Sequence, residues 1–336
     1  MKCVCVTGAS GYIGSWVVKM LLEEGLTVHG TVRSLENNEN NEHLFAMQQA
    51  YPKLKLFKAD LLDSESFLPA LEGCDTLFHT ASPVLIVKVA NPEEQLLRPA
   101  IEGTKGLLSA LKKVDCVRRV VLTSSIAAVS KGGNGLGSGK NGAYTEEDWN
   151  DNPTHPYYKS KTLAERAAWE IAHKQDHWTM VVINPGLVIG PSLSKRLGMS
   201  VRIIRDILKG KYPLFAPNLY FNCVDVRDVA KAHVLAAKSG QGRYLVVNEP
   251  ISVLSIGKML KKGFPKRWYL PVWKLPNFVV RCVAPLVGIK QEILRRNLGQ
   301  SVAYDHQKSL QLGLQYRSLQ ETILEHAKQL EEDHLV

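Results

Sequence analysis

The sequence lacks the features that place a protein in or beyond a membrane. None of its 336 residues belong to an uncharged apolar run of the roughly 18 residues that a membrane-spanning helix needs. The first residues, MKCVCVTGAS, carry no apolar core of a signal peptide, because their apolar residues already fit a short strand. The chain has no Asn-x-Ser/Thr glycosylation acceptor, and it closes on HLV, which is no sorting signal. We therefore expect a cytoplasmic protein.

Cysteine is scarce and scattered. The six cysteines contain no C-x-x-C pair, which is the usual spacing of zinc ligands. Their spacing favours a reducing compartment and predicts neither a metal site nor a disulfide framework. The six positions are Cys3, Cys5, Cys74, Cys116, Cys223 and Cys282.

Acidic residues are scarce in the second half of the chain only. The net charge is 42 − 32 = +10. Residues 1–168 carry 18 basic and 19 acidic residues, whereas residues 169–336 carry 24 and 13. Such an excess suggests nucleic acid, a membrane surface or an anionic ligand as the partner. With 45% hydrophobic and 22% charged residues, the chain can fold around a core.

Short apolar strands alternate with amphipathic helices in the first half, which predicts an α/β fold with a doubly wound parallel sheet, the Rossmann arrangement. A glycine-rich loop covers 131–142, and the last 80 residues look mostly helical. We expect a dinucleotide-binding domain over 1–185 with a return segment near 223–250, and a smaller, mostly helical substrate domain over 186–222 and 251–336. The expected strands are 3–6, 27–32, 54–59, 76–79, 120–123, 180–183 and 243–247.

Three glycines lie between the first strand and the first helix. Gly8, Gly11 and Gly14 allow a tight turn, the approach of a pyrophosphate to the backbone, and close packing of the helix on the sheet. The amino end of the helix then faces the phosphates with free N–H groups. This arrangement predicts a bound dinucleotide.

The residue at the end of the second strand determines which of the two nicotinamide cofactors is preferred. An acidic residue there binds the ribose of NAD, whereas an arginine binds the 2′-phosphate of NADP. The sequence has Arg33 followed by Ser34, and no carboxylate before Glu36, which favours NADP(H). After the third strand, Asp60 and Leu61 stand where adenine would lie.

Tyr157 and Lys161 are one helical turn apart and share a face. A lysine ammonium beside a tyrosine favours the phenolate and lowers the tyrosine pKa, so that the phenol can exchange a proton with an alkoxide. The run Thr123-Ser124-Ser125 ends the fifth strand, and a hydroxyl there can polarise a carbonyl oxygen.

Together these residues resemble the extended short-chain dehydrogenases/reductases, and within them the branch of dihydroflavonol reductases, cinnamoyl-CoA reductases and fungal carbonyl reductases. The resemblance runs from residue 3 to about 325. It rests on TGASGYIG (7–14), TVR (31–33), ADL (59–61), FHTASP (78–83), EGTKGLL (102–108), RVVLTSS (119–125), YYKSKTLAERAAWE (157–170), INPGLVIGP (183–191), VDVRDVAKAH (224–233) and LGLQYRSLQETI (312–323).

The resemblance implies NADPH-dependent reduction of an aldehyde or ketone to an alcohol. Tyr157 would be the proton donor, and Lys161 would hold the nicotinamide ribose. Ser125 would complete the catalytic set, with Ser124 as the alternative serine. The segment 224–233 would be structural. The cofactor residues it implies are Gly8, Ser10, Gly11, Tyr12, Ile13, Gly14, Arg33, Asp60, Leu61, Thr80, Ala81, Ser82, Tyr157, Lys161, Pro185, Leu187, Val188 and Ser192.

The sequence departs from both named plant enzymes. Residues 36–42 lack the lysine of dihydroflavonol reductases, and Ser130 stands where those enzymes have an asparagine. The stretch His-Pro-Tyr-Tyr-Lys-Ser-Lys at 155–161 replaces the Asn-Trp-Tyr-Cys-Tyr-Gly-Lys of cinnamoyl-CoA reductases. A generic carbonyl substrate is therefore expected. The alternatives are a membrane-associated steroid-type or other alcohol dehydrogenase using NAD(P), and a sugar-nucleotide epimerase.

If the chain is an oxidoreductase, its excess of basic residues belongs to the substrate domain. We therefore expect no nucleic-acid partner. Residues 258–296 hold ten Lys/Arg and one acid, together with aromatic residues and an apolar run. Such a stretch is typical of peripheral membrane contact, of a solvated basic face or of a pocket for an anion. We expect a monomer or a homodimer.

Overall fold

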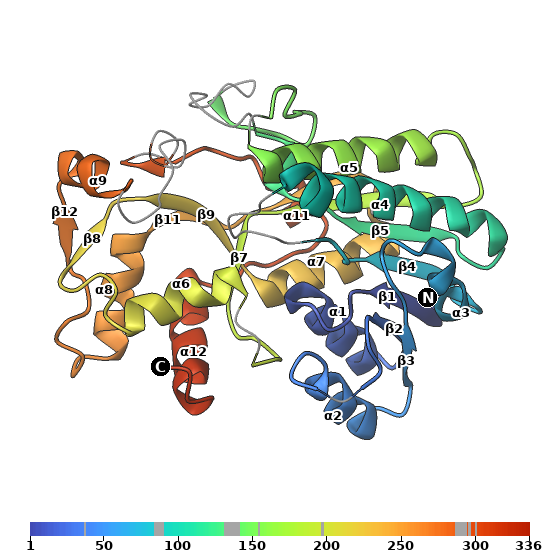
Figure 1. Ribbon diagram of the computed structural model, residues 1–336, viewed down its shortest axis with the longest axis horizontal. Coiled ribbons are helices and arrows are strands. Elements are labelled where there is room, and N and C mark those ends of the chain that lie inside the picture. The colour runs from blue at the N-terminus through green and yellow to red at the C-terminus, as the bar shows by residue number, and fades with distance from the viewer. Residues whose placement is uncertain are drawn as a thin grey trace.

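The larger lobe of the computed structural model is built on a seven-stranded parallel sheet (Figure 1). Its strand order is β10-β6-β5-β4-β1-β2-β3. This confirms the predicted doubly wound fold. The structure describes residues 1–36, 38–83, 91–130, 142–153, 155–195, 198–285, 294, 297–299 and 301–336. The strands are β1 (Cys3–Thr7), β2 (Thr27–Val32), β3 (Leu54–Lys58), β4 (Thr76–His79), β5 (Arg119–Thr123), β6 (Thr179–Pro185) and β10 (Gly242–Val246).

Helices cover both faces of this sheet because its strands are apolar on both sides. One face packs against α1 (Tyr12–Glu23), α2 (Glu42–Ala50) and α7 (Val226–Ser239) in a continuous apolar core. The other packs against α3 (Leu68–Leu71), α4 (Arg98–Ala110) and α5 (Pro156–Ala172). Short helices η1 (Ser64–Phe67), η2 (Glu93–Leu97), η3 (Leu111–Lys113) and η4 (Ile126–Ala128) flank these elements.

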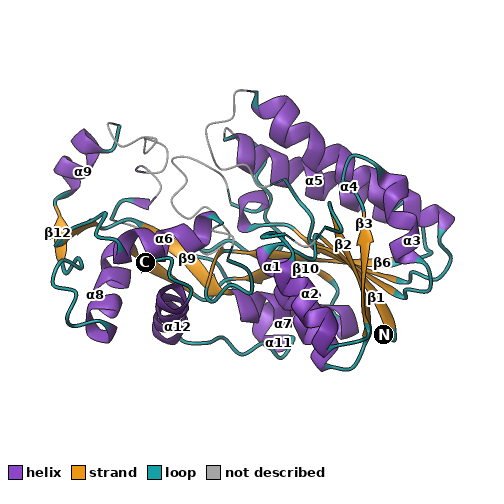
Figure 2. Cartoon of the chain, turned by 60° about the horizontal axis from the view of Figure 1, so that its bottom comes forward, coloured by secondary structure: helices purple, strands orange, loops and turns teal. Residues whose placement is uncertain are grey.

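A second, smaller lobe lies beyond one side of the sheet, with its own apolar core (Figure 2). The expectation of a mostly helical lobe is confirmed, although two small sheets, β11-β9-β7 and β12-β8, run through it. Its helices are α6 (Met199–Leu208), α8 (Val253–Gly263), α9 (Asn277–Val283) and α12 (Leu319–Glu332); its strands are β7 (Leu187–Ile189), β8 (Phe215–Pro217), β9 (Tyr220–Asp225), β11 (Glu249–Ser252) and β12 (Trp273–Leu275). The short helix α11 (Gln307–Gln311) contacts β10.

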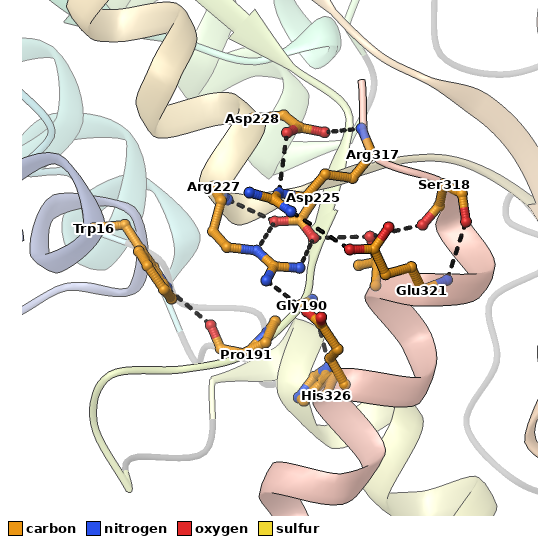
Figure 3. Close-up of polar contacts among 12 residues, drawn as sticks. Trp16, Gly190, Pro191, Asp225, Arg227, Asp228, Arg317, Ser318, Glu321 and His326 are labelled. Atoms are coloured by element: carbon orange, nitrogen blue, oxygen red, sulfur yellow. Dashed lines mark hydrogen bonds and ion pairs between the residues drawn. The ribbon is translucent and has the colours of Figure 1, made fainter. Parts of the chain in front are cut away.

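A buried carboxylate joins the two lobes (Figure 3). Asp225 is fully buried and caps α7, accepting bonds from the Arg227 backbone at 2.7 Å and from its guanidinium at 2.6 and 2.9 Å. Asp225 also accepts from the Thr322 hydroxyl of α12 at 2.7 Å. These partners satisfy the carboxylate, so the segment 224–233 acts in holding α12 against α7.

Candidate functional site

The first glycine turn leaves no room for side chains. Gly8 has φ +66°, and a Cβ there would lie 2.9 Å from the Ala81 Cα. A Cβ on Gly14 would collide with the Gly8 carbonyl and lie 2.8 Å from the Thr80 hydroxyl. The Gly11 N–H donates to the Gly8 carbonyl at 2.8 Å and closes the turn. The backbone is thus bare at the amino end of α1, and this cradle fits a pyrophosphate.

Two side chains of α1 fix this turn against the second lobe. The Tyr12 hydroxyl donates to the Gly190 carbonyl at 2.6 Å, and the Trp16 ring nitrogen donates to the Pro191 carbonyl at 2.9 Å, the latter drawn in Figure 3. Burial raises the Tyr12 pKa well above its ordinary value, so the phenol stays protonated and keeps this bond. Ser10 and Ile13, beside the turn, are partly exposed.

The residues predicted to contact the adenosine end lie at the carboxyl ends of β2 and β3. Arg33 is exposed and makes no hydrogen bond or ion pair with any residue that the structure describes. Ser34 accepts a bond from the Glu36 N–H at 3.1 Å. Asp60 caps its own turn by accepting from the Leu62 N–H at 2.8 Å, and Leu61 packs against α4. The Arg33 guanidinium is therefore available to an anion.

The ends of β1 and β4 are tied together by side chains. The Thr7 hydroxyl contacts the His79 Nδ1 at 2.8 Å, and the Thr80 hydroxyl donates to the Thr7 carbonyl at 2.7 Å. The Ala81 N–H donates to the Thr7 hydroxyl at 3.3 Å. Burial, helped by the Lys161 charge, lowers the pKa of His79 to about 3. His79 is thus a neutral ring that positions the loop containing Ala81 and Ser82.

The fold brings Ser125, Tyr157 and Lys161 together at the carboxyl ends of β4 and β5. Tyr157 lies in the first turn of α5 and hydrogen-bonds through its side chain to Ser125. Ser125 begins η4, where its hydroxyl accepts from the Ala127 N–H at 3.2 Å. The buried Lys161 ammonium donates to the Ser82 hydroxyl at 3.1 Å.

The electrostatics of the pair differ from those predicted. Burial is the largest effect on Tyr157 and raises its pKa, while the Ser125 hydrogen bond lowers it. The expectation that Lys161 brings this pKa down is therefore not met in this structure. Burial also lowers the pKa of Lys161 to about 8, against the opposing effect of Glu165.

Sequence reasoning missed Glu165, one turn beyond Lys161. Its side chain is fully buried, and its carboxylate accepts from the Ser124 hydroxyl at 2.5 Å and the Asn184 amide at 2.8 Å. Arg243 of β10 donates to it at 2.6 Å, and Asn184 also donates to the Ser125 carbonyl at 3.2 Å. The spacing Tyr157, Lys161, Glu165 places all three on one helix face and was the available clue.

The remaining predicted cofactor residues lie at the carboxyl end of β6 and directly after it. Pro185 ends β6, and Leu187 and Val188 open β7. The Ser192 N–H donates to the Gln329 side chain of α12 at 2.8 Å. The glycine-rich loop 131–142 lies, except for its last residue, outside the described residues.

Two other features lie away from this site. Among the residues that the structure describes, one group has metal-ligand geometry: Cys3, His29 and Cys74, near the opposite edge of the sheet. A surface hollow of about 490 Å³ also lies at that opposite edge, next to Asp75 and Arg118. Ligands of doubly wound sheets bind at the carboxyl edge, so this hollow is not the cofactor site. No described helix has the length and apolar character needed to span a bilayer.

Comparison with known proteins agrees with this geometry. The model of the NAD dependent epimerase/dehydratase family matches residues 4–248. A cinnamoyl-CoA reductase of Medicago truncatula is 37% identical, covering 98% of this chain and 95% of the relative. Cinnamoyl-CoA reductase 2 of Arabidopsis thaliana is 38% identical, covering 98% and 93%.

A solved structure is similar over nearly the whole chain. The methylglyoxal/isovaleraldehyde reductase Gre2 of yeast, complexed with NADPH, has a TM-score of 0.82 at 28% identity, covering 99% of this chain and 100% of that one. These matches confirm the resemblance and the fold drawn from the sequence.

Proposed function

Because the chain belongs to the NAD dependent epimerase/dehydratase family, among the extended short-chain dehydrogenases/reductases, we propose that it reduces an aldehyde or ketone to an alcohol with NADPH. It is a carbonyl-reducing oxidoreductase and uses NADP(H) as cofactor. The observation that carries the finer proposal is the convergence of Ser125, Tyr157 and Lys161 beside the bare glycine turn.

In this proposal, bound NADPH supplies the hydride, and the chain's own residues handle the proton. The Ser125 hydroxyl polarises the substrate oxygen, and the Tyr157 phenol gives it a proton. A raised Tyr157 pKa suits reduction, since the phenol stays protonated at neutral pH. Lys161 orients the ribose as a buried ammonium, and the phosphates lie at the amino end of α1.

Replacing Tyr157 by phenylalanine tests this mechanism. Tyr157→Phe removes only the donated proton, so turnover should fall by about 100-fold or more while NADPH binding persists. Turnover is followed by NADPH absorbance, and binding by NADPH fluorescence. Tyr158→Phe is the matched control, because Tyr158 has no lysine four residues on (Thr162). Full activity of Tyr157→Phe would refute the assignment.

The substrate class is tested by a panel. We propose that 186–222 and 251–336 form the substrate domain, with 1–185 and 223–250 binding the dinucleotide. The relatives named above include cinnamoyl-CoA reductases, whose name indicates a thioester substrate. The panel therefore contains aldehydes, ketones and a cinnamoyl-CoA thioester. If the chain turned over the thioester and none of the aldehydes or ketones, the proposed substrate class would be wrong.

We also propose that the smaller lobe touches anionic membranes. Trp268, Trp273 and Phe278 are 72%, 54% and 71% exposed. Trp273 belongs to β12 and Phe278 to α9, and both elements lie at the end of the molecule away from the seven-stranded sheet (Figure 1). Residues 251–285 contain seven Lys/Arg and no acid, and the exposed ones include Lys274 and Arg281. Exposed aromatic residues with surrounding positive charge fit the interface of an anionic bilayer. Of the basic stretch 258–296, residues 286–293, 295 and 296 lie outside the description.

Vesicle flotation tests this contact. The chain should float with phosphatidylserine vesicles at low salt, less at high salt, and not with neutral vesicles. Trp268→Ala with Phe278→Ala should abolish flotation, whereas Leu62→Ala, equally exposed at 69% but on the other lobe, should not. Salt-independent self-association instead would make this face the interface of the expected homodimer. A cytoplasmic location is part of the proposal, because all six cysteines are unpaired.

A further inference from the structure

Three potential metal ligands meet at the edge of the sheet opposite Tyr157. Cys3 begins β1, His29 lies in β2, and Cys74 precedes β4. Their ligand atoms all lie within 4.8 Å of one another. They are 26 and 45 residues apart in the sequence, so no spacing motif announces them. The fold alone brings them together.

The two separations from the Cys3 sulfur match those of ligands on one tetrahedral ion. The Cys3 Sγ lies 3.6 Å from the Cys74 Sγ and 3.7 Å from the His29 Nε2. Zinc bonds of about 2.3 Å to sulfur and 2.0–2.1 Å to nitrogen place two sulfurs about 3.8 Å apart, and sulfur and nitrogen about 3.6 Å apart. The Cys74 Sγ lies 3.4 Å from the His29 Nδ1, so the Cys74 side chain must turn toward Nε2 for the three groups to share a zinc ion.

The histidine is already in the tautomer that a metal needs. Its Nδ1 lies 2.9 Å from the Ala70 carbonyl, which can only accept a hydrogen bond. Nδ1 must therefore carry the proton, which leaves the lone pair on Nε2, the atom facing Cys3. A backbone carbonyl that orients a ligating histidine in this way is a recurring feature of zinc sites.

The surroundings favour a soft cation with an open coordination position. Cys74 and His29 are buried, whereas Cys3 is partly exposed next to the first residues of the chain. Two thiols and an imidazole select zinc over magnesium or calcium, which prefer oxygen ligands.

We propose that Cys3, His29 and Cys74 bind a zinc ion, with a water molecule as the fourth ligand. The ion replaces the thiol protons of Cys3 and Cys74, and both protons pass to the solvent. The site is separate from the proposed reductase chemistry, which lies at the carboxyl ends of the strands.

Metal retention tests the proposal directly. The untagged full-length chain, reduced with a phosphine, is equilibrated with Zn²⁺, gel-filtered and analysed by elemental mass spectrometry. We expect about one zinc ion per chain, and a loss of tenfold or more in Cys3→Ser and Cys74→Ser. Cobalt in place of zinc should give a thiolate-to-cobalt charge-transfer band in the wild type, and not in Cys3→Ser or Cys74→Ser.

A thiol outside the cluster provides the matched control. Cys282→Ser, at an exposed cysteine of α9, should retain zinc like the wild type. Zinc should also raise the melting temperature of the wild type and of Cys282→Ser, but not of Cys3→Ser, whose circular dichroism without metal checks its fold. No zinc on the wild type, or equal zinc on Cys3→Ser, would overturn the proposal, as would a Cys3–Cys74 disulfide persisting in reductant.

Discussion

At the scale of single residues, cofactor choice depends on Arg33. Its guanidinium is exposed and has no partner among the described residues, so it can bind a phosphate without breaking another contact. A charge-assisted hydrogen bond contributes about 1.5–3 kcal/mol. Arg33→Glu should therefore lower kcat/KM for NADPH by about 10–100-fold and leave kcat/KM for NADH equal or higher.

The charge change itself needs a control. Lys112→Glu makes the same change at an exposed residue of η3, which precedes the amino end of β5, and should leave the NADPH/NADH ratio as in the wild type. An unchanged ratio in Arg33→Glu would mean that the 2′-phosphate is bound elsewhere. Strand periodicity alone was sufficient to place Arg33 directly after β2, and its contact with the cofactor stays a prediction.

At the scale of elements, the ion pair of Glu165 and Arg243 joins α5 to β10 beneath the proposed site. The side chains of Glu165 and Arg243 are 0% and 6% exposed. Glu165 raises the Lys161 pKa, which burial alone would lower further. In Glu165→Gln, the Lys161 pKa should fall below about 8, and Arg243 should be left without its carboxylate. Removing one partner of a buried pair costs about 3–5 kcal/mol.

Two measurements separate these effects. The alkaline fall of kcat/KM should move to lower pH in Glu165→Gln, because the Lys161 ammonium is lost earlier; a purely structural role would lower the melting temperature without moving the profile. Glu170→Gln changes an exposed acid on the same helix and should alter neither. A wild-type pH profile in Glu165→Gln would show that its charge does not act on Lys161.

The same pair shows where sequence reasoning stops. Local patterns predicted the strands, the glycine turn and the helix that carries Tyr157 and Lys161, because each depends on neighbours in the chain. Arg243 lies 78 residues from Glu165, and Cys3 lies 71 from Cys74. These contacts depend on strand order and on side-chain burial, which no local pattern encodes. The Tyr157 pKa was mispredicted for the same reason, since burial raises it and the opposing effect comes from the Ser125 hydrogen bond.

At the scale of the whole molecule, buried neutral histidines set the response to acid. Burial lowers the pKa of His79 to about 3 and those of His233 and His326 to about 4. The unfolded chain binds their protons near pH 6.5, whereas the folded chain does so only near pH 3–4. Stability is therefore fully present above about pH 6.5 and is lost as the pH falls.

Buried carboxyl groups with a raised pKa have the opposite effect on stability, and they are fewer than the histidines. Burial raises the pKa of Asp228 to about 6, so its contribution changes in the other direction, falling as the pH rises from about 4 to 6. Burial also raises the pKa of Glu146 and lowers that of His43. Because the histidines with a lowered pKa outnumber the carboxyls with a raised one, we expect the free energy of unfolding to decrease between about pH 6.5 and pH 4, by about 1.4 kcal/mol per pH unit for each uncompensated proton.

Urea unfolding at several pH values measures this slope. In His326→Gln one titrating group is removed, so the slope should decrease by about one proton. The replacement keeps a side chain able to accept from the Gly190 N–H, which His326 contacts at 3.4 Å. His173→Gln, at an exposed histidine of the α5 end, should leave the slope unchanged. Equal slopes in the wild type and His326→Gln would mean that folding does not lower the His326 pKa, despite the burial of this residue on α12.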